Sequence, residues 1–209
     1  MILVGQYDSP YVRRVAITLH HYCLPFTRNP ISVFTDAADM AKINPLVRIP
    51  SLVLDDGEVL IDSAAIIDYL DEAAGPARAL TPPAGLERRR IAQLTATATG
   101  AIDKAGAMVY ERHFHGPGAV NEDWLARCQC QLEGALQFLE DRLTGEWFVS
   151  GRFTQADLTA GAMLGYLNLR VPRVLEGARF RRLKGLSAAC EALPAFLAAR
   201  PGPNEVMPG

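Results

Sequence analysis

Two dipeptides, Ile49-Pro50 and Asp62-Ser63, stand where they could present backbone groups to a ligand. Ile49-Pro50 comes just before an apolar run at residues 51–54, which is short enough to be a buried strand. Proline has no N–H to donate to a strand ladder, so here it indicates a rigid bend that exposes the N–H and C=O of Ile49. The Ile49-Pro50 bond is either cis or an ordinary trans bond in a loop, and trans is much the commoner form.

Asp62-Ser63 comes directly before a helical pattern that ends near residue 74. Hydroxyl and amide groups at a helix start, with the positive end of the helix dipole behind them, can bind an anion. Asp and Ser are also preferred N-cap residues, and taken alone the pair fits a plain helix cap better. Neither dipeptide decides the function by itself.

The residues around these dipeptides predict a small mixed sheet of four strands with helices packed on it. Asp56-Gly57 between two apolar runs is typical of a β-hairpin turn, and Ser9-Pro10 is typical of a helix start. The helix after Ser9 has one apolar face, and its other face carries Arg13 and Arg14. In chain order the predicted elements are a strand at residues 1–7, a helix at 11–22, a weak strand at 26–33, a short helix at 36–42, a hairpin at 51–61 and a helix at 63–74. The strand–helix–strand start implies a right-handed parallel crossover.

A stretch rich in Pro, Gly and Ala, residues 75–85, is predicted to be a linker between domains 1–74 and 86–209. Beyond it helical patterns dominate, at residues 86–113, 122–143, 158–169 and 180–200, followed by a loose tail at 201–209. Thr154 and Asp157 form a variant of the capping box before the third of these helices. Gly100 and Gly106 weaken the first helix by about 1 kcal/mol each relative to Ala, so close packing against a neighbour or a ligand is expected there.

The composition narrows the class of protein. The chain has 209 residues, of which 49% are hydrophobic and 21% charged, values ordinary for a globular protein with a sizeable core. A formal net charge of −2 implies no overall attraction to nucleic acid or acidic membranes. The chain opens without a signal-peptide pattern, and no apolar run is long enough to span a membrane. Four scattered cysteines do not form a disulfide framework, which favours reduced thiols and a cytoplasmic location.

Taken together, these motifs resemble the cytosolic glutathione S-transferases, of the serine-type, bacterial-like kind, over nearly the whole chain. The motifs that carry the resemblance are Ser9-Pro10-Tyr11-Val12-Arg13, Asn44-Pro45 leading to Ile49-Pro50, Asp62-Ser63, Ser150-Gly151, and the capping residues Thr154 and Asp157. The resemblance implies an α+β fold, with a thioredoxin-like N-terminal domain of order βαβαββα followed by an all-α C-terminal domain. It also implies a homodimer with an active site in each subunit.

The resemblance assigns a role in glutathione binding to four residues. Ile49 matches the residue before the family's cis proline, whose backbone pairs with the cysteinyl part of glutathione. Asp62 and Ser63 match the acidic-Ser pair that binds the γ-glutamyl group, with the Ser and its N–H holding the carboxylate. Arg48 matches a position that often carries Gln or Lys near the peptide, so a contact from Arg48 is expected.

Ser9 matches the catalytic serine or cysteine at the start of the first helix, and Tyr7 is its rival. Only a thiolate attacks, and a free thiol has a pKa near about 8.5, so lowering that pKa raises reactivity. A Ser9 hydroxyl at a helix N-terminus can donate a hydrogen bond to the glutathione sulfur and stabilise its charge. Other classes use a Tyr at the end of the first strand for the same donation. Because serine cannot form a mixed disulfide, thioether formation is favoured over disulfide exchange.

The resemblance implies a pocket for an electrophilic, mostly apolar second substrate. The residues expected to line it are Tyr11, Met108, Tyr110 and His113. His113 and His115 could also be a metal pair near Glu111, but no further ligand cluster is visible, so no metal is expected. Asp103, on the helix at residues 86–113, is expected to reach the glutathione amine of the partner subunit.

The expected function is therefore that of a glutathione transferase, with glutathione as co-substrate and no tightly bound cofactor. One alternative is a glutathione-dependent isomerase or dehalogenase of the same fold. Another is a non-catalytic protein that binds glutathione. Neither nucleic acid nor a membrane is expected as a partner, and two Arg-rich segments, Arg88-Arg89-Arg90 and Arg179-Phe180-Arg181-Arg182, fit solvated helix faces.

Overall fold

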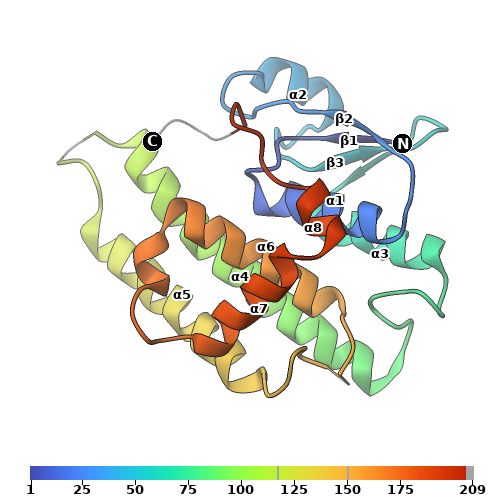
Figure 1. The fold of residues 1–209 in the computed structure, drawn as a ribbon. Helices are drawn as coiled ribbons and strands as arrows, with labels where there is room; N and C mark the ends of the chain where they lie inside the picture. Colours follow the sequence, from blue (N-terminus) through green and yellow to red (C-terminus); the bar gives the residue numbers. More distant parts are fainter. Residues whose placement is uncertain (117, 150, 206–209) are drawn as a thin grey trace. The chain divides into compact units, whose positions relative to one another are not determined.

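The computed structural model describes residues 1–116, 118–149 and 151–205. Ser150 of the predicted Ser150-Gly151 motif lies outside the described residues. The chain forms two compact units (Figure 1): residues 1–83 together with the segment that starts at Ala192, and residues 84–191.

A mixed four-stranded sheet forms the centre of the first unit. Its strands are β1 (Ile2–Val4), β2 (Thr27–Asn29), β3 (Ser51–Val53) and β4 (Val59–Ile61), in the spatial order β2-β1-β3-β4. β1 pairs with β2 in parallel, and the pairs β1–β3 and β3–β4 are antiparallel. Leu3 and Leu52, which face each other across β1 and β3, are both fully buried. The predicted crossover and hairpin are confirmed, although β2 is shorter than the predicted strand.

Helices cover both faces of this sheet. α1 (Pro10–His21) and α3 (Ser63–Ala74) lie on one side, and α2 (Ala37–Ile43) lies on the other (Figure 1). α1 begins as predicted, because the Ser9 side chain accepts a hydrogen bond from the Val12 backbone N–H. Arg13 and Arg14, expected on the face opposite the apolar one, are also buried. α1 therefore packs on more than one side.

Residues 192–205 belong to the first unit, whereas the sequence placed all of residues 86–209 in the helical domain. They contain α8 (Pro194–Ala198), whose Phe196 is fully buried. The Arg13 guanidinium carbon lies 5.5 Å from the centroid of the Phe196 ring, and Arg13 Nε donates to the Ala199 carbonyl at 3.1 Å. Further on, Glu205 pairs with Arg28 of β2. These contacts tie residues 192–205 to the first unit, where the sequence predicted a loose tail from residue 201.

The C-terminal end of α1 is tied to the stretch that the sequence predicted as a linker. The Tyr22 hydroxyl donates to the Asp71 carboxylate of α3 and accepts from the Leu80 backbone N–H at 2.7 Å. Arg78 Nη2 donates to the Tyr22 carbonyl at 2.8 Å. Burial raises the pKa of both Tyr22 and Asp71. Residues 75–83 are therefore part of the first unit's hydrogen-bond network.

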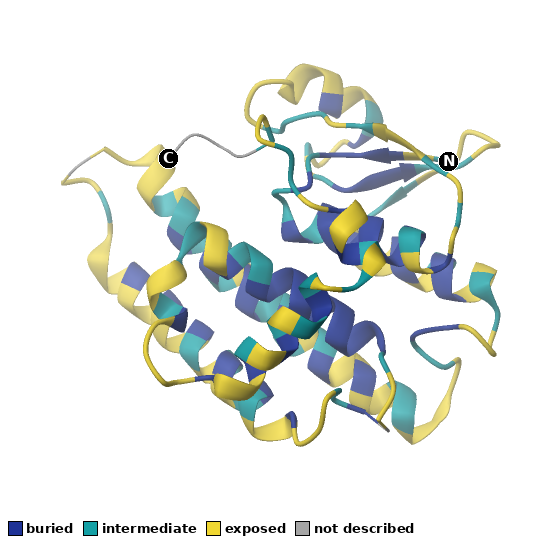
Figure 2. Ribbon diagram, viewed as in Figure 1, coloured by how far each residue is buried: buried dark blue, intermediate teal, exposed yellow. Residues whose placement is uncertain are grey.

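The second unit is a bundle of helices. Its elements are α4 (Gly85–Phe114), α5 (Glu122–Arg142), α6 (Gln155–Arg170), the 3-10 helix η1 (Pro172–Leu175) and α7 (Arg181–Glu191). α4 packs against α5 and α6, and α7 packs against α6. Buried residues follow the inner sides of these helices, and α6 is buried along most of its length (Figure 2). Among the described residues, no helix combines the length and apolar character that a membrane span requires.

Asp157 anchors the start of α6 through the predicted capping box. Thr154 donates to the Asp157 carboxylate from its backbone N–H at 2.8 Å and from its hydroxyl at 2.7 Å. The Phe148 backbone N–H donates to the same carboxylate at 2.8 Å. Asp157 is fully buried, so this one side chain holds both the helix start and the preceding loop.

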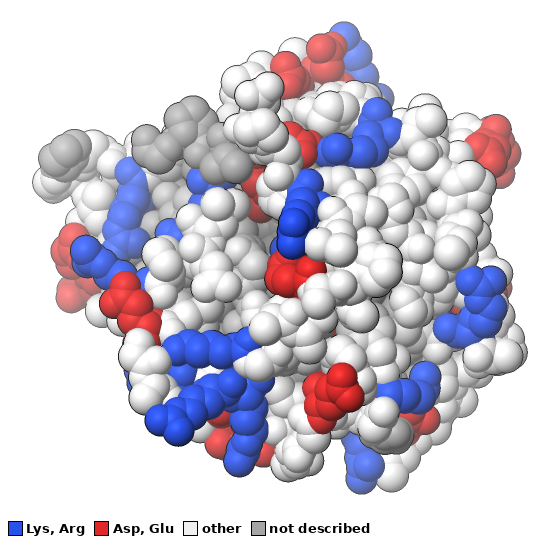
Figure 3. Space-filling view, viewed as in Figure 1, with Lys and Arg blue, Asp and Glu red and all other residues white. Residues whose placement is uncertain are grey.

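Charged side chains are mixed on the surface. Lys and Arg lie beside Asp and Glu across the face shown in Figure 3. In the helical unit, for example, Arg179 of the second Arg-rich segment pairs with Glu133 at 3.0 Å. Such exposed pairs contribute little to stability, but they show that this basic segment is partly neutralised by its neighbours.

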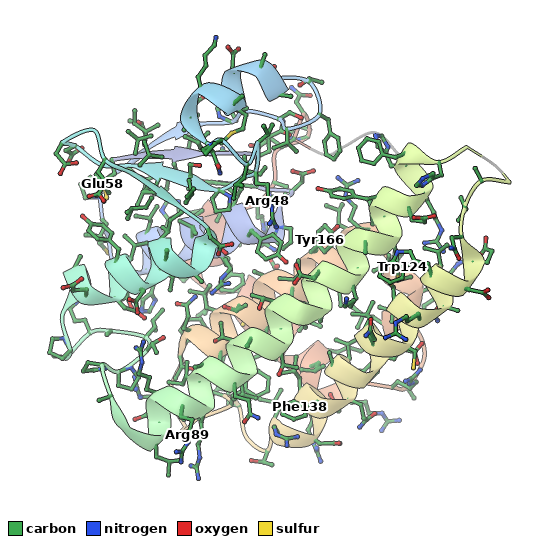
Figure 4. The ribbon with its side chains drawn as sticks, turned by 180° about the vertical axis from the view of Figure 1, so that it is seen from behind. Arg48, Glu58, Arg89, Trp124, Phe138 and Tyr166 are labelled. Carbon is green, nitrogen blue, oxygen red and sulfur yellow. The ribbon has the colours of Figure 1, made fainter. Side chains whose placement is uncertain are left out.

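Gly100, in the middle of α4, is predicted to be a site where alanine stabilises the protein. An added Cβ would have no described atom within 4 Å, so the expected close packing is not found there. At Gly106 the nearest atom is the Tyr166 hydroxyl oxygen of α6, at an ordinary 3.8 Å; Figure 4 shows Tyr166 beside α4. We expect Gly100→Ala to raise the free energy of unfolding by up to about 1 kcal/mol, because glycine lowers helix propensity by that amount. Denaturant titration measures this change, and a loss of stability would contradict the prediction.

Candidate active site

Ser9 lies at the junction between β1 and α1, with its side chain partly exposed. Its backbone is extended, at φ −72° and ψ 121°, as is usual for an N-cap residue. The Ser9 Oγ accepts from the Val12 N–H at 3.4 Å. Since the oxygen serves as the acceptor for the helix, the hydroxyl proton is available for donation to another group.

Tyr7 has a different environment. Only 2% of its surface is exposed, and the Arg28 guanidinium carbon lies 3.5 Å from the centroid of its ring. Burial raises the pKa of Tyr7, while the nearby Arg28 charge opposes that rise. The Tyr7 ring therefore belongs to the interior of the first unit, beneath the Arg28–Glu205 pair.

The loop before β3 is held in shape by Asn44. This buried side chain donates to the Arg48 carbonyl at 2.8 Å and accepts from the Leu46 backbone N–H at 2.9 Å. The Ile49-Pro50 peptide bond that follows is cis, which settles the alternative left open by the sequence. Arg48 is exposed, and Figure 4 shows it at the opposite end of β3 from Glu58 of the hairpin.

Gly5 is the point at which β1, α1 and this loop meet. Its φ of +126° is in a region that side-chain-bearing residues rarely adopt. A Cβ at Gly5 would lie 2.6 Å from Cγ2 of Val12 and 2.9 Å from Cβ of Ile49. The absence of a side chain at Gly5 therefore allows Ile49 to lie against the first turn of α1. Gly5 was not among the residues predicted from the sequence, although a glycine between a strand and a helix start was a possible signal.

Asp62 and Ser63 form the N-terminus of α3, and Asp62 is its N-cap. The Asp62 carboxylate accepts from the Ala64 backbone N–H at 2.9 Å. Asp62 has φ 70° and ψ 135°, a strained conformation for a residue other than glycine. Strain of this kind costs on the order of 1–3 kcal/mol and clusters at functional sites. Ser63 is buried, and its hydroxyl oxygen lies 3.5 Å from Nη1 of Arg14.

The structure thus places three of the residues predicted for the glutathione site around the first turns of α1. Ser9 caps this helix, Ile49 approaches it through Gly5, and Ser63 approaches it through Arg14. Arg14 was predicted to lie on this helix but not to take part in a site. Its signal was weak, because two consecutive arginines in a helix normally indicate a solvated face.

The residues predicted to line the second-substrate pocket come from two units. Tyr11, on α1, is partly exposed. On α4, Met108 is buried and Tyr110 and His113 are exposed, and both exposed rings are close to Phe114, with centroids 5.9 Å and 4.9 Å away. The pocket itself remains a prediction. Within the described part of the chain, no group of three or more potential ligands could hold a metal ion.

Comparisons with known proteins agree with this arrangement. The family model for the glutathione S-transferase N-terminal domain matches residues 3–78, and the model for the C-terminal domain matches residues 122–198. The GST-like protein YibF of Escherichia coli K12 is 31% identical over 170 residues, which are 81% of this chain and 83% of YibF. The chain belongs to the glutathione S-transferase family.

Two further relatives of this transferase-family chain are informative. A protein of Vibrio cholerae named as a probable maleylacetoacetate isomerase is 28% identical, over 96% of this chain and 95% of its own. The crystal structure of a glutathione S-transferase from Methylobacillus flagellatus, with glutathione bound, superposes with a TM-score of 0.90. That protein is 28% identical, and the match covers 96% of this chain and 99% of the other.

Proposed function

We propose that this protein binds glutathione in its first unit and activates the thiolate for attack on an electrophilic, mostly apolar second substrate. The observation that carries the proposal is the position of Ser9. Its partly exposed hydroxyl caps α1 at the place where the Ile49 loop and the Ser63 helix start converge. A structural relative whose crystal structure contains bound glutathione supports the choice of ligand.

Each residue has a chemical role in this proposal. The backbone of Ile49 pairs with the cysteinyl part of glutathione, and Arg48 contacts the peptide from solvent. Asp62 and Ser63 bind the γ-glutamyl group. Ser9 donates a hydrogen bond to the sulfur, where the positive end of the α1 dipole also favours the thiolate. Both effects lower the pKa of the thiol from its ordinary value and raise the thiolate fraction at neutral pH.

Ser9 is favoured over Tyr7 as the group that stabilises the thiolate. A donor to a bound thiolate must be within hydrogen-bond reach of the ligand, and the Ser9 hydroxyl is partly exposed. Tyr7 is buried under Arg28 and its pKa is raised by burial, so its ring supports the fold of the first unit.

The helical unit is proposed to supply the pocket for the second substrate, with Met108, Tyr110 and His113 contributing and Tyr11 joining them from α1. The protein is proposed to work in the cytoplasm as a homodimer. A metal or tightly bound cofactor has no place in the reaction, since the thiolate itself is the nucleophile.

Glutathione-dependent isomerisation is the second candidate, favoured by the names of two relatives. The Vibrio protein and a maleylacetoacetate isomerase of Pseudomonas aeruginosa each match 96% of this chain, with 28% and 29% identity. In such a reaction the thiolate would add to a conjugated double bond, the intermediate would rotate about the resulting single bond, and the thiolate would leave again. Conjugation consumes one glutathione per product molecule and isomerisation consumes none, so measuring free thiol during turnover separates the two reactions.

Ser9→Ala tests the assignment of the thiolate donor. A hydrogen bond to a charged group is worth about 1.5–3 kcal/mol, so we expect kcat/KM for a generic aromatic halide to fall by about 10- to 150-fold. The pH–rate profile should also shift to higher pH, because the bound thiol loses its stabilising donor. Tyr7→Phe is the matched control and should keep most of the activity.

Loss of the α1 cap in Ser9→Ala should cost about 1 kcal/mol of stability, so thermal unfolding is measured alongside the kinetics. Full activity in Ser9→Ala with a large loss in Tyr7→Phe would transfer the role to Tyr7. A wild-type protein that is not retained on immobilised glutathione and shows no thiol consumption would contradict the proposed function as a whole.

A further inference from the structure

We infer that Glu205 is a positioning residue for the proposed reaction, and that it acts by fixing the place of the Ser9 hydroxyl. Its effect passes through the Arg28 guanidinium of β2 and the Tyr7 ring. This inference rests on the proposed function. It gives the C-terminal segment, residues 192–205, a part in the chemistry of the first unit.

The backbone of Ser9 is held by a hydrogen bond on each side. The Ser9 N–H donates to the Gln6 carbonyl at 3.2 Å and closes a turn that contains Tyr7. The Ser9 carbonyl accepts from the Arg13 N–H at 2.9 Å, in the first turn of α1. The position of the Ser9 hydroxyl therefore depends on where the Tyr7 turn and the first turn of α1 lie.

The C-terminal segment holds a side chain in each of these two turns. It runs from α8, which packs against α1, toward the sheet (Figure 1). Arg13 Nε donates to the Ala199 carbonyl at 3.1 Å. On the other side, the Arg28 guanidinium carbon lies 3.5 Å from the centroid of the Tyr7 ring, and Arg28 pairs with Glu205. One stretch of chain therefore fixes the turns on both sides of the proposed thiolate donor.

The Glu205 carboxylate is held more firmly than that of an ordinary surface pair. Its Oε1 pairs with Arg28, and its Oε2 accepts from the Gly202 backbone N–H at 2.8 Å. Only 12% of the Glu205 side chain is exposed. Exposed ion pairs contribute little, because long, hydrated side chains must be held in one geometry. Here a second donor already fixes the carboxylate, so Glu205 can hold the Arg28 guanidinium over the Tyr7 ring.

A purely structural role is the rival explanation, in which Glu205 only ties the end of the chain to β2. Loss of the pair would then lower the stability of the first unit and reduce activity whether or not Ser9 carries its hydroxyl. A positioning role acts through that hydroxyl. Its effect must therefore disappear when the hydroxyl is absent.

The test is Glu205→Gln, which removes the charge and keeps the size of the side chain. We expect kcat/KM for a generic aromatic halide to fall by about 3- to 10-fold, a part of the loss in Ser9→Ala, because a hydrogen bond weakens as its distance and angle depart from their optimum. Glutathione affinity, measured by calorimetry at a pH where the thiol is protonated, should stay close to that of wild type. The residues proposed to hold the peptide are Ile49, Asp62 and Ser63, on other elements.

The direction of the pKa change of the bound thiol separates positioning from a through-space effect of charge. Removing the Glu205 charge and leaving Arg28 unpaired would each favour a nearby thiolate, and so would lower that pKa. A misplaced Ser9 hydroxyl raises the pKa, because the thiolate loses a hydrogen-bond donor. We expect a rise in Glu205→Gln, in the same direction as in Ser9→Ala. The ultraviolet absorbance of the thiolate, followed during a pH titration of the complex, measures it.

The double variant Ser9→Ala/Glu205→Gln shows whether the effect passes through Ser9. Its kcat/KM and bound-thiol pKa should equal those of Ser9→Ala, because no hydroxyl is left to position. Glu133→Gln is the matched control, since it breaks a Glu–Arg pair, with Arg179, in the helical unit. It should leave both quantities unchanged. Arg28→Lys keeps the charge but loses the planar group over the ring, so it should raise the thiol pKa as Glu205→Gln does.

An unchanged or lowered thiol pKa in Glu205→Gln would overturn the inference. Equal losses of kcat/KM on adding Glu205→Gln to wild type and to Ser9→Ala would overturn it as well. If Glu205→Gln does not fold, Glu205→Asp, which draws the carboxylate back by one methylene, carries the same comparisons. A wild-type protein that binds no glutathione would overturn the proposed function itself, which keeps the two failures distinguishable.

Discussion

Replacing Asp157 with alanine is expected to lower the free energy of unfolding by about 3–5 kcal/mol, a large part of the roughly 5–15 kcal/mol typical of folded proteins. The carboxylate accepts three hydrogen bonds, from the backbone N–H groups of Phe148 and Thr154 and from the Thr154 hydroxyl. Asp157 has no exposed surface, so water cannot replace the lost acceptor at these donors. Chemical denaturation at fixed protein concentration, followed by circular dichroism, measures the change.

Two further variants serve as controls for the loss of stability in Asp157→Ala. Asp157→Asn keeps one acceptor oxygen and should lose less stability than Asp157→Ala. Asp141→Ala removes an exposed carboxylate whose contact is with Gln137 on the surface of α5, and it should change stability by no more than about 0.5 kcal/mol. If Asp157→Ala and Asp141→Ala were equally mild, the capping box would not be the anchor of the helical unit.

Gly5→Ala is expected to reduce both stability and glutathione affinity. The new Cβ would lie 2.6 Å from Val12 and 2.9 Å from Ile49, and the backbone φ of +126° is unfavourable for alanine. Overpacking costs about 1–3 kcal/mol, and backbone strain adds on the order of 1–3 kcal/mol. Since Ile49 must move away from α1 to relieve the overlap, the proposed backbone contact with the cysteinyl group is lost as well. Denaturation and calorimetry with glutathione measure the two effects.

Gly57→Ala separates the contributions of strain and packing. Gly57, in the β3–β4 turn, also has a positive φ, +92°, but a Cβ there would have no described atom within 4 Å. It should therefore cost only the backbone strain and leave glutathione affinity unchanged. Equal effects in Gly5→Ala and Gly57→Ala would show that the contact between Gly5 and Ile49 has no consequence for the site.

Local patterns predicted most of the fold. The Ser9 cap, the Asp-Gly turn and the capping box at Thr154 act over a few residues, so the sequence carries them directly. The cis state of Ile49-Pro50 could only be left open, because it depends on what surrounds the bond. The length of β2 could not be predicted either, because only the residues that pair with β1 form the strand.

The parts that could not be predicted depend on contacts between distant residues. The pair Arg13-Arg14 predicts a solvated helix face. The two side chains are buried because α3 and α8 cover α1. No local sequence pattern around Gly5 predicts its contact with Ile49. Tyr22 joins Asp71 across 49 positions and Leu80 across 58, and nothing in the sequence of residues 75–85 showed that this stretch packs with α1.

The return of the chain from Ala192 to the first unit has a consequence for biosynthesis. Phe196, Ala199 and Glu205 complete contacts with Arg13 and Arg28, residues made about 180 positions earlier. A ribosome must therefore translate the whole helical unit before the thioredoxin-like unit can acquire its last helix. Until then α1 has an uncovered side with a cation and apolar surface, and a nascent chain halted before residue 192 would offer that side to chaperones.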